Sequence, residues 1–277
     1  MSDQETKPGL NRRQLLGTSA ALAAGAPAIG GLGLIGAPAR AQEAGGHATV
    51  APGELDEYYV FTSGGHSGEI RIVGLPSMRE LKRIPVFNRE SATGWGQTNE
   101  SRRVLTEGMT PEALEFLADK GGIYMNGDLH HPHPSFTDGT YDGRYLFAND
   151  KANTRVCRIR LDVMRCDKII QIPNQHTVHG LRLQKYPRTG YVFANGEDGV
   201  PIPNDGKILD DPTAYRSVFS AIDADTMKVA WQIKVDGNLD NVDSDYQGKY
   251  CFSTCYNSEN GVTLADMMAS DEDWVVI

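Results

Sequence analysis

Three histidines and one carboxylate lie within the seven-residue segment Gly127-Asp128-Leu129-His130-His131-Pro132-His133. The whole chain has only 7 histidines, so this is a strong local concentration. Imidazole is the commonest side-chain metal ligand and suits copper, zinc, iron and nickel. Adjacent histidines on a regular strand point to opposite faces, so His130 and His131 could share only a multi-metal site that they approach separately. The segment predicts a metal site in extended chain, because Pro132 and Pro134 exclude a helix.

The other polar side chains near this segment carry weaker signals. Asp128 could hold an imidazole N–H beside a metal, or it could be an ordinary turn aspartate. His133 precedes a proline, and we expect it to have a structural role or to hydrogen-bond to a metal ligand without itself binding the metal. His176 and His179 form His-x2-His, which is a weak metal signal by its spacing alone.

Two recurring patterns indicate the elements that position these residues. One is Tyr-x-Phe followed by small or polar residues: Tyr59/Phe61, Tyr145/Phe147, Tyr191/Phe193 and Tyr250/Phe252. The other is a turn methionine with apolar residues six and eight positions later: Met78/Ile84/Val86, Met164/Ile170/Ile172 and Met227/Ile233/Val235. The period-two apolar pairs mark strands with one buried face. Each unit should therefore hold a Tyr-x-Phe strand, a second strand, a turn and a third strand.

Such antiparallel units predict an all-β chain with the blades of a β-propeller, of which three to four are present. A β-sandwich is the simpler alternative. One insertion, 106–120, should form a short helix capped by Thr110 with Pro111 in its first turn. The acidic segment 236–245 lacks the order of a calcium loop and should be a turn-rich blade connection, facing the propeller channel. Buried free thiols are expected for all four cysteines, since Cys251 and Cys255 lie too far apart on one strand for a disulfide.

The N-terminus indicates export. Asn11-Arg12-Arg13-Gln14-Leu15-Leu16-Gly17 is a twin-arginine element, an Ala/Gly/Leu-rich run follows, and Ala39-Arg40-Ala41 matches a small-residue cleavage site. We expect residues 1–41 to be a removable signal peptide, residues 42–277 to reside in the periplasm, and no membrane anchor to remain after cleavage. The formal net charge of −9 argues against nucleic acid as a partner.

Several of these stretches together resemble the nitrous-oxide reductase family over nearly the whole mature chain. The resemblance lies in Gly-Asp-Leu-His-His-Pro-His with the following Ser-Phe-Thr-Asp-Gly-Thr-Tyr-Asp-Gly-Arg-Tyr-Leu-Phe-Ala-Asn-Asp-Lys-Ala-Asn, in His179-Gly180-Leu181-Arg182 and in Tyr256-Asn257-Ser258-Glu259. It implies a seven-bladed propeller followed by a cupredoxin domain with a binuclear copper centre. Because only three to four blades are seen here, 42–277 is expected to be the N-terminal part of a longer protein.

The resemblance also implies the site and its chemistry. A sulfide-bridged tetranuclear copper cluster held by seven histidines would reduce N2O to N2 and water. The ligands in this chain would be His130, His131 and His179, which makes His176 a bystander. The other four ligands are expected beyond Ile277, so this chain alone should be inactive.

Further partners follow from the same resemblance. A structural calcium is expected at Tyr256, Glu259, Met267 and Asp273, the methionine contributing its backbone carbonyl, in keeping with the preference of calcium for hard oxygen donors. Electrons would come from a periplasmic cytochrome c or a cupredoxin, and a head-to-tail homodimer would join the binuclear centre of one subunit to the cluster of the other. The alternatives are a non-catalytic binding propeller, or another periplasmic propeller oxidoreductase such as a quinone-dependent dehydrogenase.

Overall fold

A computed structural model describes residues 49–120, 122, 126–204, 215–235, 237–256, 262–270 and 272–277, and for 272–275 it describes the backbone alone. The expected signal peptide, 1–41, and the expected calcium ligand Glu259 lie outside the described residues. Within this part, no helix is both long enough and apolar enough to cross a membrane.

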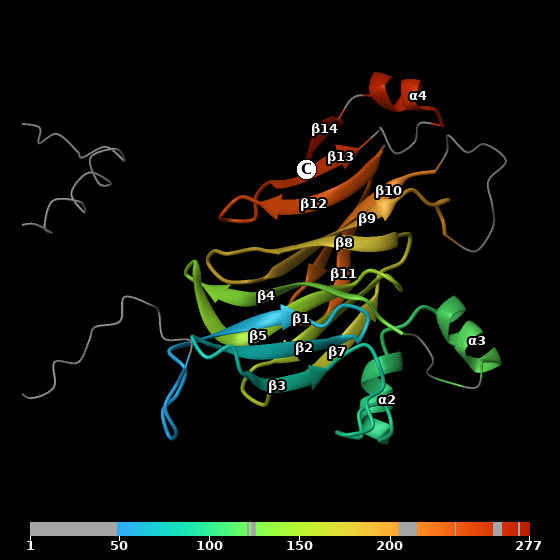
Figure 1. Cartoon of the computed structure of the whole chain (residues 1–277). Helices are drawn as coiled ribbons and strands as arrows, with labels where there is room; N and C mark the ends of the chain where they lie inside the picture. Colours follow the sequence, from blue (N-terminus) through green and yellow to red (C-terminus); the bar gives the residue numbers. More distant parts are fainter. Residues whose placement is uncertain are drawn as a thin grey trace, which may run out of the picture. The chain divides into compact units, whose positions relative to one another are not determined.

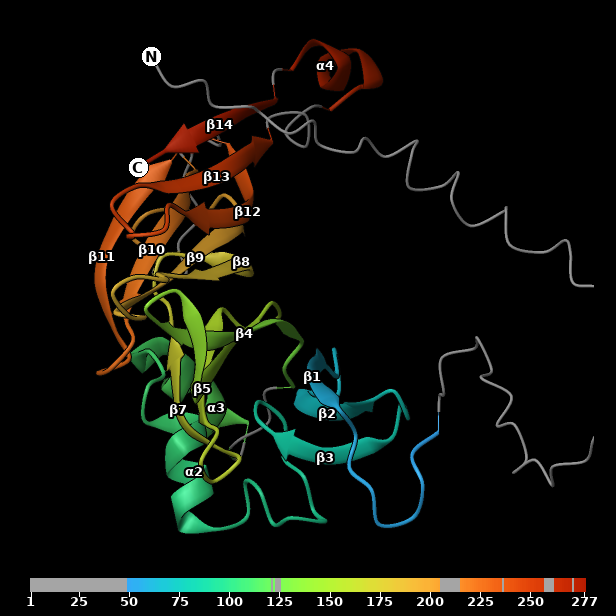
Figure 2. The same cartoon turned by 90° about the vertical axis from the view of Figure 1, so that its left-hand side faces the viewer.

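The strands of the described residues form four antiparallel sheets that follow one another in chain order (Figures 1 and 2). The first holds β1 (Tyr58–Ser63), β2 (Glu69–Leu75) and β3 (Glu80–Pro85). The second holds β4 (Leu129–Thr137), β5 (Thr140–Asp150), β6 (Arg155–Arg160) and β7 (Arg165–Gln171). The third holds β8 (His176–Leu183), β9 (Tyr191–Asp198), β10 (Ser217–Asp223) and β11 (Lys228–Val235), and the fourth holds β12 (Asn238–Ser244), β13 (Cys251–Tyr256) and β14 (Glu272–Val276).

The expected all-β propeller class is confirmed, since each sheet is a meander of neighbouring strands, as propeller blades are. The expected three-strand unit is incomplete. The Tyr-x-Phe motif lies on β1, β5 and β9 and leads into β13, but three of the sheets have a further strand before it, namely β4, β8 or β12. This first strand carries histidine, proline, glycine and aspartate instead of a period-two apolar pattern, so the sequence did not reveal it. Segment 236–245 is accordingly mostly strand β12, not a turn-rich connection.

The recurring methionine occupies the same strained position in three turns. Met78, Met164 and Met227 have φ of 58°, 49° and 53°, a left-handed conformation that residues other than glycine rarely adopt. In two of these turns the methionine N–H donates to the carbonyl oxygen four residues earlier, from Met78 to Gly74 at 2.8 Å and from Met227 to Asp223 at 2.8 Å. The methionine pattern therefore marks the hairpin between the last two strands of a blade.

The insertion between the first two sheets contains two helices. Thr110 caps α3 (Pro111–Asp119) by accepting from the Ala113 N–H at 3.4 Å, and Pro111 opens it, as expected. The expected bounds of 106–120 were too wide at the start, because Thr106 ends a preceding helix, α2 (Asn99–Thr106), that the sequence did not indicate. A short helix, α4 (Leu264–Ala269), precedes β14.

Three apolar clusters hold consecutive sheets together. The first joins residues of the first and second sheets, such as Ile70 and Leu146. The second joins the second and third sheets, as in Phe147 and Val192, and the third joins Phe219 to residues of the fourth sheet. All four cysteines are buried and none forms a disulfide; Cys157 belongs to the first cluster and Cys251 to the third. Each blade is thus stabilised by the burial of apolar surface against its neighbours.

Candidate metal centre

The first strands of three sheets, β4, β8 and β12, carry the candidate site, and each is interrupted by a bulge. The pairing register shifts between His130 and His133 in β4, between Val178 and Leu181 in β8, and between Leu239 and Val242 in β12. A bulge re-aims side chains and is common beside active sites.

The same residue pattern accompanies each bulge, directly before it in β4 and across its start in β8 and β12. Each of these strands has a completely buried apolar residue followed by a polar one: Leu129-His130, Val178-His179 and Leu239-Asp240. In each case the apolar residue pairs with the residue five positions after the tyrosine of the Tyr-x-Phe motif. His131 is the extra residue in β4, with φ of 42°. This left-handed turn removes the opposite-face arrangement that a regular strand would impose on His130 and His131.

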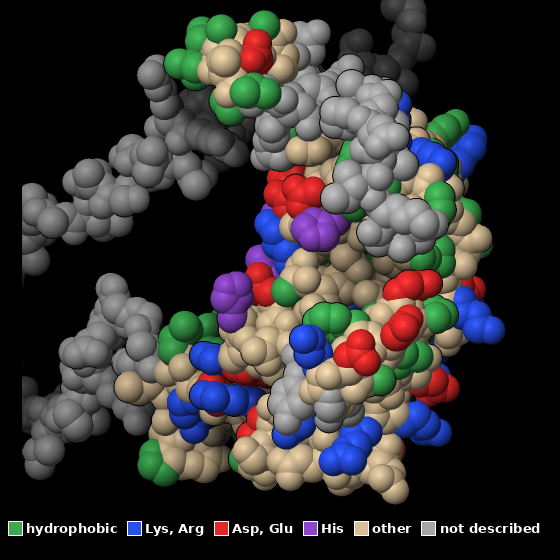
Figure 3. Space-filling view, turned by 90° about the vertical axis from the view of Figure 1, so that its right-hand side faces the viewer, with side chains coloured by type: hydrophobic (Ala, Val, Ile, Leu, Met, Phe, Trp, Pro, Cys, Tyr) green, Lys and Arg blue, Asp and Glu red, His purple; other side chains and the backbone are tan. Residues whose placement is uncertain are grey.

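The structure brings the three expected copper ligands together. The ring centroids of His130 and His131 are 6.0 Å apart, those of His130 and His179 are 5.5 Å apart, and those of His131 and His179 are 5.0 Å apart. One nitrogen of each ring lies within 4.8 Å of the others, and all three residues are partly buried. Histidine side chains lie beside acidic ones on the face seen in Figure 3.

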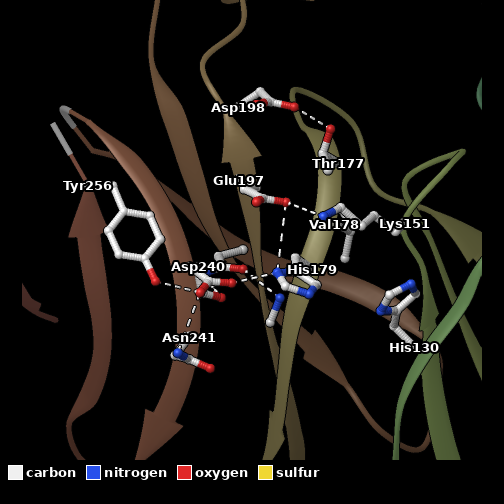
Figure 4. A network of polar contacts seen from close by, with 12 residues as sticks. His130, Lys151, Thr177, Val178, His179, Glu197, Asp198, Asp240, Asn241 and Tyr256 are labelled. Atoms are coloured by element: carbon white, nitrogen blue, oxygen red, sulfur yellow. Dashed lines mark hydrogen bonds and ion pairs between the residues drawn. The ribbon is translucent and has the colours of Figure 1, made fainter. Parts of the chain in front are cut away.

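Asp240 of β12 orients His179 (Figure 4). Its Oδ1 lies 2.5 Å from His179 Nδ1, and its Oδ2 accepts the Tyr256 hydroxyl at 2.7 Å. Because a carboxylate only accepts, Nδ1 carries the proton and Nε2 keeps the lone pair that a metal needs. The sequence placed 236–245 near the channel but did not single out this aspartate, and its spacing offered no signal for the contact.

Asp128 contacts His130 through the other ring nitrogen. Its Oδ2 lies 3.1 Å from His130 Nε2, which leaves Nδ1 of that ring as the atom that can ligate a metal. Its Oδ1 lies 3.1 Å from Nδ1 of His66 on the surface. Asp150, completely buried, fixes the backbone here: it accepts the Asp128 N–H at 2.7 Å and pairs with Arg155 at 2.6 Å. The structure gives Asp128 this contact, while its role beside a metal stays a prediction.

His133 contacts Arg182 of β8 and is not part of the three-imidazole group. The Arg182 guanidinium lies 2.7 Å from His133 Nε2 and donates to the Leu181 carbonyl oxygen at 2.9 Å. Since arginine only donates, His133 Nε2 accepts and the ring is neutral. Desolvation, followed by the charge of Arg182, lowers the pKa of His133 to about 4.

His131 is also neutral at ordinary pH. Burial, followed by the neighbouring His179 and Arg182, lowers the pKa of His131 to about 4. A neutral imidazole is the form that ligates a metal.

A carboxylate of β9 completes the polar surroundings. Glu197 Oε2 lies 3.7 Å from His179 Nδ1 and 2.8 Å from Lys151 Nζ, so Lys151 compensates its charge and Asp240 is the closer partner of the imidazole. Neither Glu197 nor Lys151 was expected at the site.

The remaining expected residues are placed as follows. His176 is exposed and paired with Asp198 at 3.0 Å, outside the three-imidazole group. Of the expected calcium ligands, Tyr256 ends β13 and Met267 is exposed on α4, while Asp273 pairs through the β14 backbone with Cys255. The calcium site stays a prediction.

The donor set suits copper by its chemistry. Three imidazoles converge, and two have one nitrogen held by a carboxylate, an arrangement that fixes the tautomer of a ligating histidine.

Comparisons with known proteins show which proteins this chain is similar to. Residues 172–241 match the family model described as nitrous oxide reductase propeller repeat 2, which covers the third sheet and the start of β12. A nitrous-oxide reductase of Pseudomonas fluorescens is 55% identical over 99% of this chain and 42% of its own length. One of Stutzerimonas stutzeri is 52% identical over 100% of this chain and 43% of its own length.

Among solved structures, the hydrazine synthase of Kuenenia stuttgartiensis is similar at 13% identity and a TM-score of 0.44, over 75% of this chain and 44% of that one. This likeness is too distant to bear on function. The chain thus spans less than half the length of the curated relatives it matches. Over nearly its whole length, this chain is thus similar to nitrous-oxide reductases, and it carries a segment that matches their second propeller repeat.

Proposed function

We propose that this polypeptide takes part in the reduction of N2O to N2 and water at a tetranuclear copper–sulfide cluster, and that His130, His131 and His179 supply three of the ligands. The observation that carries the proposal is the convergence of these three imidazoles from two neighbouring blades, each with a nitrogen within 4.8 Å of the others. The names of the relatives support the reaction.

The residues of this chain prepare the site. Asp240 keeps a proton on His179 Nδ1, and Asp128 occupies His130 Nε2, so the two rings offer Nε2 and Nδ1 respectively. Burial keeps His131 unprotonated, so no proton has to be displaced near neutral pH. The copper–sulfide group, when bound, would supply the two electrons that break the N–O bond, as cofactors carry such chemistry.

The setting of the reaction is part of the same proposal. Residues 1–41 act as a twin-arginine signal, and 42–277 contributes blades of the propeller in the periplasm. A cytochrome c or cupredoxin donates electrons through a binuclear copper centre in the remainder of the polypeptide, within a homodimer. The twin-arginine element and the family relationship support this setting.

Calcium is proposed at Tyr256, Glu259, Met267 and Asp273. Its support is that β13 and β14 pair Cys255 with Asp273, next to Tyr256. Removal of calcium with a chelator should lower the melting temperature, and an unchanged melting temperature after metal analysis has verified removal would contradict the site.

The main test is metal analysis of the protein expressed from its complete gene and purified without oxygen. We expect copper and acid-labile sulfide, and N2O consumption with a reduced electron donor. The 277-residue chain alone should consume no N2O. Zinc alone, or no metal, in the complete protein would overturn the proposal and favour a non-catalytic binding propeller.

A further inference from the structure

The polar residue that follows the Tyr-x-Phe motif recurs at a fixed distance from it. It stands four positions after the tyrosine, as Ser63 in β1, Asn149 in β5 and Asn195 in β9. Both asparagines are completely buried. A buried amide is costly unless it is hydrogen-bonded, so the partners of these side chains show what the position does.

Each of these side chains donates to the first strand of the next sheet. The contacts are Ser63 Oγ to the Leu129 carbonyl oxygen of β4, Asn149 Nδ2 to the carbonyl oxygens of Val178 at 2.5 Å and His179 at 3.0 Å in β8, and Asn195 Nδ2 to the Asp240 carbonyl oxygen of β12 at 2.9 Å. In three successive sheets, the side chain at this position thus donates to the backbone of the next blade, either at the buried apolar residue, at the polar residue after it, or at both.

In β8 and β12 the accepting carbonyls belong to residues at the bulge, whereas in β4 the paired His130 separates Leu129 from the bulge. A bulge disrupts the ladder hydrogen bonds of its own sheet, so backbone groups there need other partners. Asn149 supplies one for two successive carbonyls, those of Val178 and His179. The side chain therefore fixes the peptide groups on both sides of the His179 α-carbon.

Asn195 makes the corresponding connection one blade further. Its Oδ1 accepts the Gly180 N–H at 2.9 Å while its Nδ2 donates to the Asp240 carbonyl oxygen. It thereby joins β8 to β12 beside the His179–Asp240 hydrogen bond. The backbone of His179 is held by Asn149 on one side and, through Gly180, by Asn195 on the other.

We propose that Asn149 is a positioning residue for the metal site: it locks the bulge of β8 across the boundary between two blades and so sets the direction of the His179 imidazole. The role rests on the proposed function only for the identity of the group that His179 binds. The interblade lock itself is a property of the metal-free protein.

The test replaces Asn149 with leucine, which is similar in shape but cannot donate. Asn149→Ser is a milder variant that keeps one donor, as Ser63 does in β1. The matched control is Asn153→Leu, because Asn153 lies in the turn after β5 and donates to Asn126 and Asp150, not to β8. All variants are made in the protein expressed from its complete gene, with circular dichroism and thermal unfolding as measures of folding.

In the metal-free protein, hydrogen exchange should rise in peptides covering 176–183 for Asn149→Leu, less for Asn149→Ser, and not for Asn153→Leu, while 217–235 stays protected. In the metal-loaded protein, Asn149→Leu should lower copper affinity about tenfold or more and change the electron paramagnetic resonance spectrum. The lock would be overturned if hydrogen exchange in Asn149→Leu rose equally in all peptides. It would also be overturned if this variant kept both the hydrogen exchange and the copper binding of the wild-type protein. If the wild-type protein binds no copper, the proposed function fails while the exchange result still decides on the lock.

Discussion

At the scale of single residues, the site depends on which nitrogen of each imidazole is left free. Asp240 and Asp128 contact opposite nitrogens of His179 and His130, so the two rings approach the same centre by different atoms. Sequence could predict the ligand types, because three histidines in four positions are rare. It could not predict Asp240, Glu197 or Lys151, since their approach to His179 depends on how three blades meet.

Removal of the carboxylate at position 240 should therefore weaken metal binding. Asp240→Ala leaves His179 free to rotate and to change tautomer, and we expect copper affinity to fall about 10- to 100-fold. Copper stoichiometry and competition with a chelator measure this. Asp225→Ala, which breaks an exposed ion pair with Arg188, is the control and should bind copper normally.

The thiols provide a pH-dependent prediction away from the metal. Burial, with the nearby Asp245 carboxylate, raises the pKa of Cys251 from 9.0 to about 12. Only the thiolate is nucleophilic, so Cys251 should resist iodoacetamide at pH 8 in the folded protein and react once it unfolds.

The same shift affects stability with a definite sign. Above about pH 9 the unfolded chain loses a thiol proton that the folded protein keeps, so the free energy of unfolding should fall as the pH rises. Cys251→Ala should reduce this slope in urea unfolding measured between pH 8 and 10. A slope that is the same in the variant would contradict the shift.

At the scale of elements, the repeats of tyrosine, phenylalanine and methionine predicted strands because they follow the period of a half-buried sheet. The strand that precedes the Tyr-x-Phe motif in three of the sheets escaped prediction for the opposite reason. Its bulge inserts a residue that breaks the alternation, as His131 does in β4. Helix α3 was predictable from Thr110 and Pro111, whereas α2 has the capping threonine Thr98 but no proline in its first turn to mark its start.

Gly180 tests how closely two of these first strands must pack. A Cβ at this position would lie 2.4 Å from the Asp240 carbonyl oxygen and 2.7 Å from a Val242 methyl group. Gly180→Ala should separate β8 from β12 and lower the free energy of unfolding by about 1–3 kcal/mol. Gly199→Ala is the control, because its Cβ meets atoms no closer than 3.5 Å. Equal stability of the two variants in urea unfolding would contradict the close approach.

At the scale of the whole described chain, each sheet is stabilised mainly by apolar contacts with the neighbouring sheets. Each apolar cluster joins two consecutive sheets, so each blade contacts mainly its neighbours, as in other repeat proteins. Composition and repeats sufficed to predict this architecture, because each blade buries a similar set of apolar residues against its neighbours.

A core substitution should therefore act locally. Phe219 is completely buried and stacks on Trp231 with ring centroids 6.0 Å apart, so Phe219→Ala should cost about 3–5 kcal/mol. Hydrogen exchange should rise in the third and fourth sheets more than in the first. Phe116→Ala, at a 56% exposed position, is the control, and an even rise across all sheets would contradict local coupling.

The repeated position after the buried apolar residue has a consequence for how such a centre could arise. His130, His179 and Asp240 occupy it in three successive blades, directly before the bulge in β4 and within the bulge in β8 and β12. Gene duplication of one blade would therefore also duplicate a position from which a side chain can reach the centre. A single codon change at that position could replace a histidine with an aspartate, or the reverse. The chemistry at the centre could then diversify one side chain at a time, while the burial that folds the blades stayed the same.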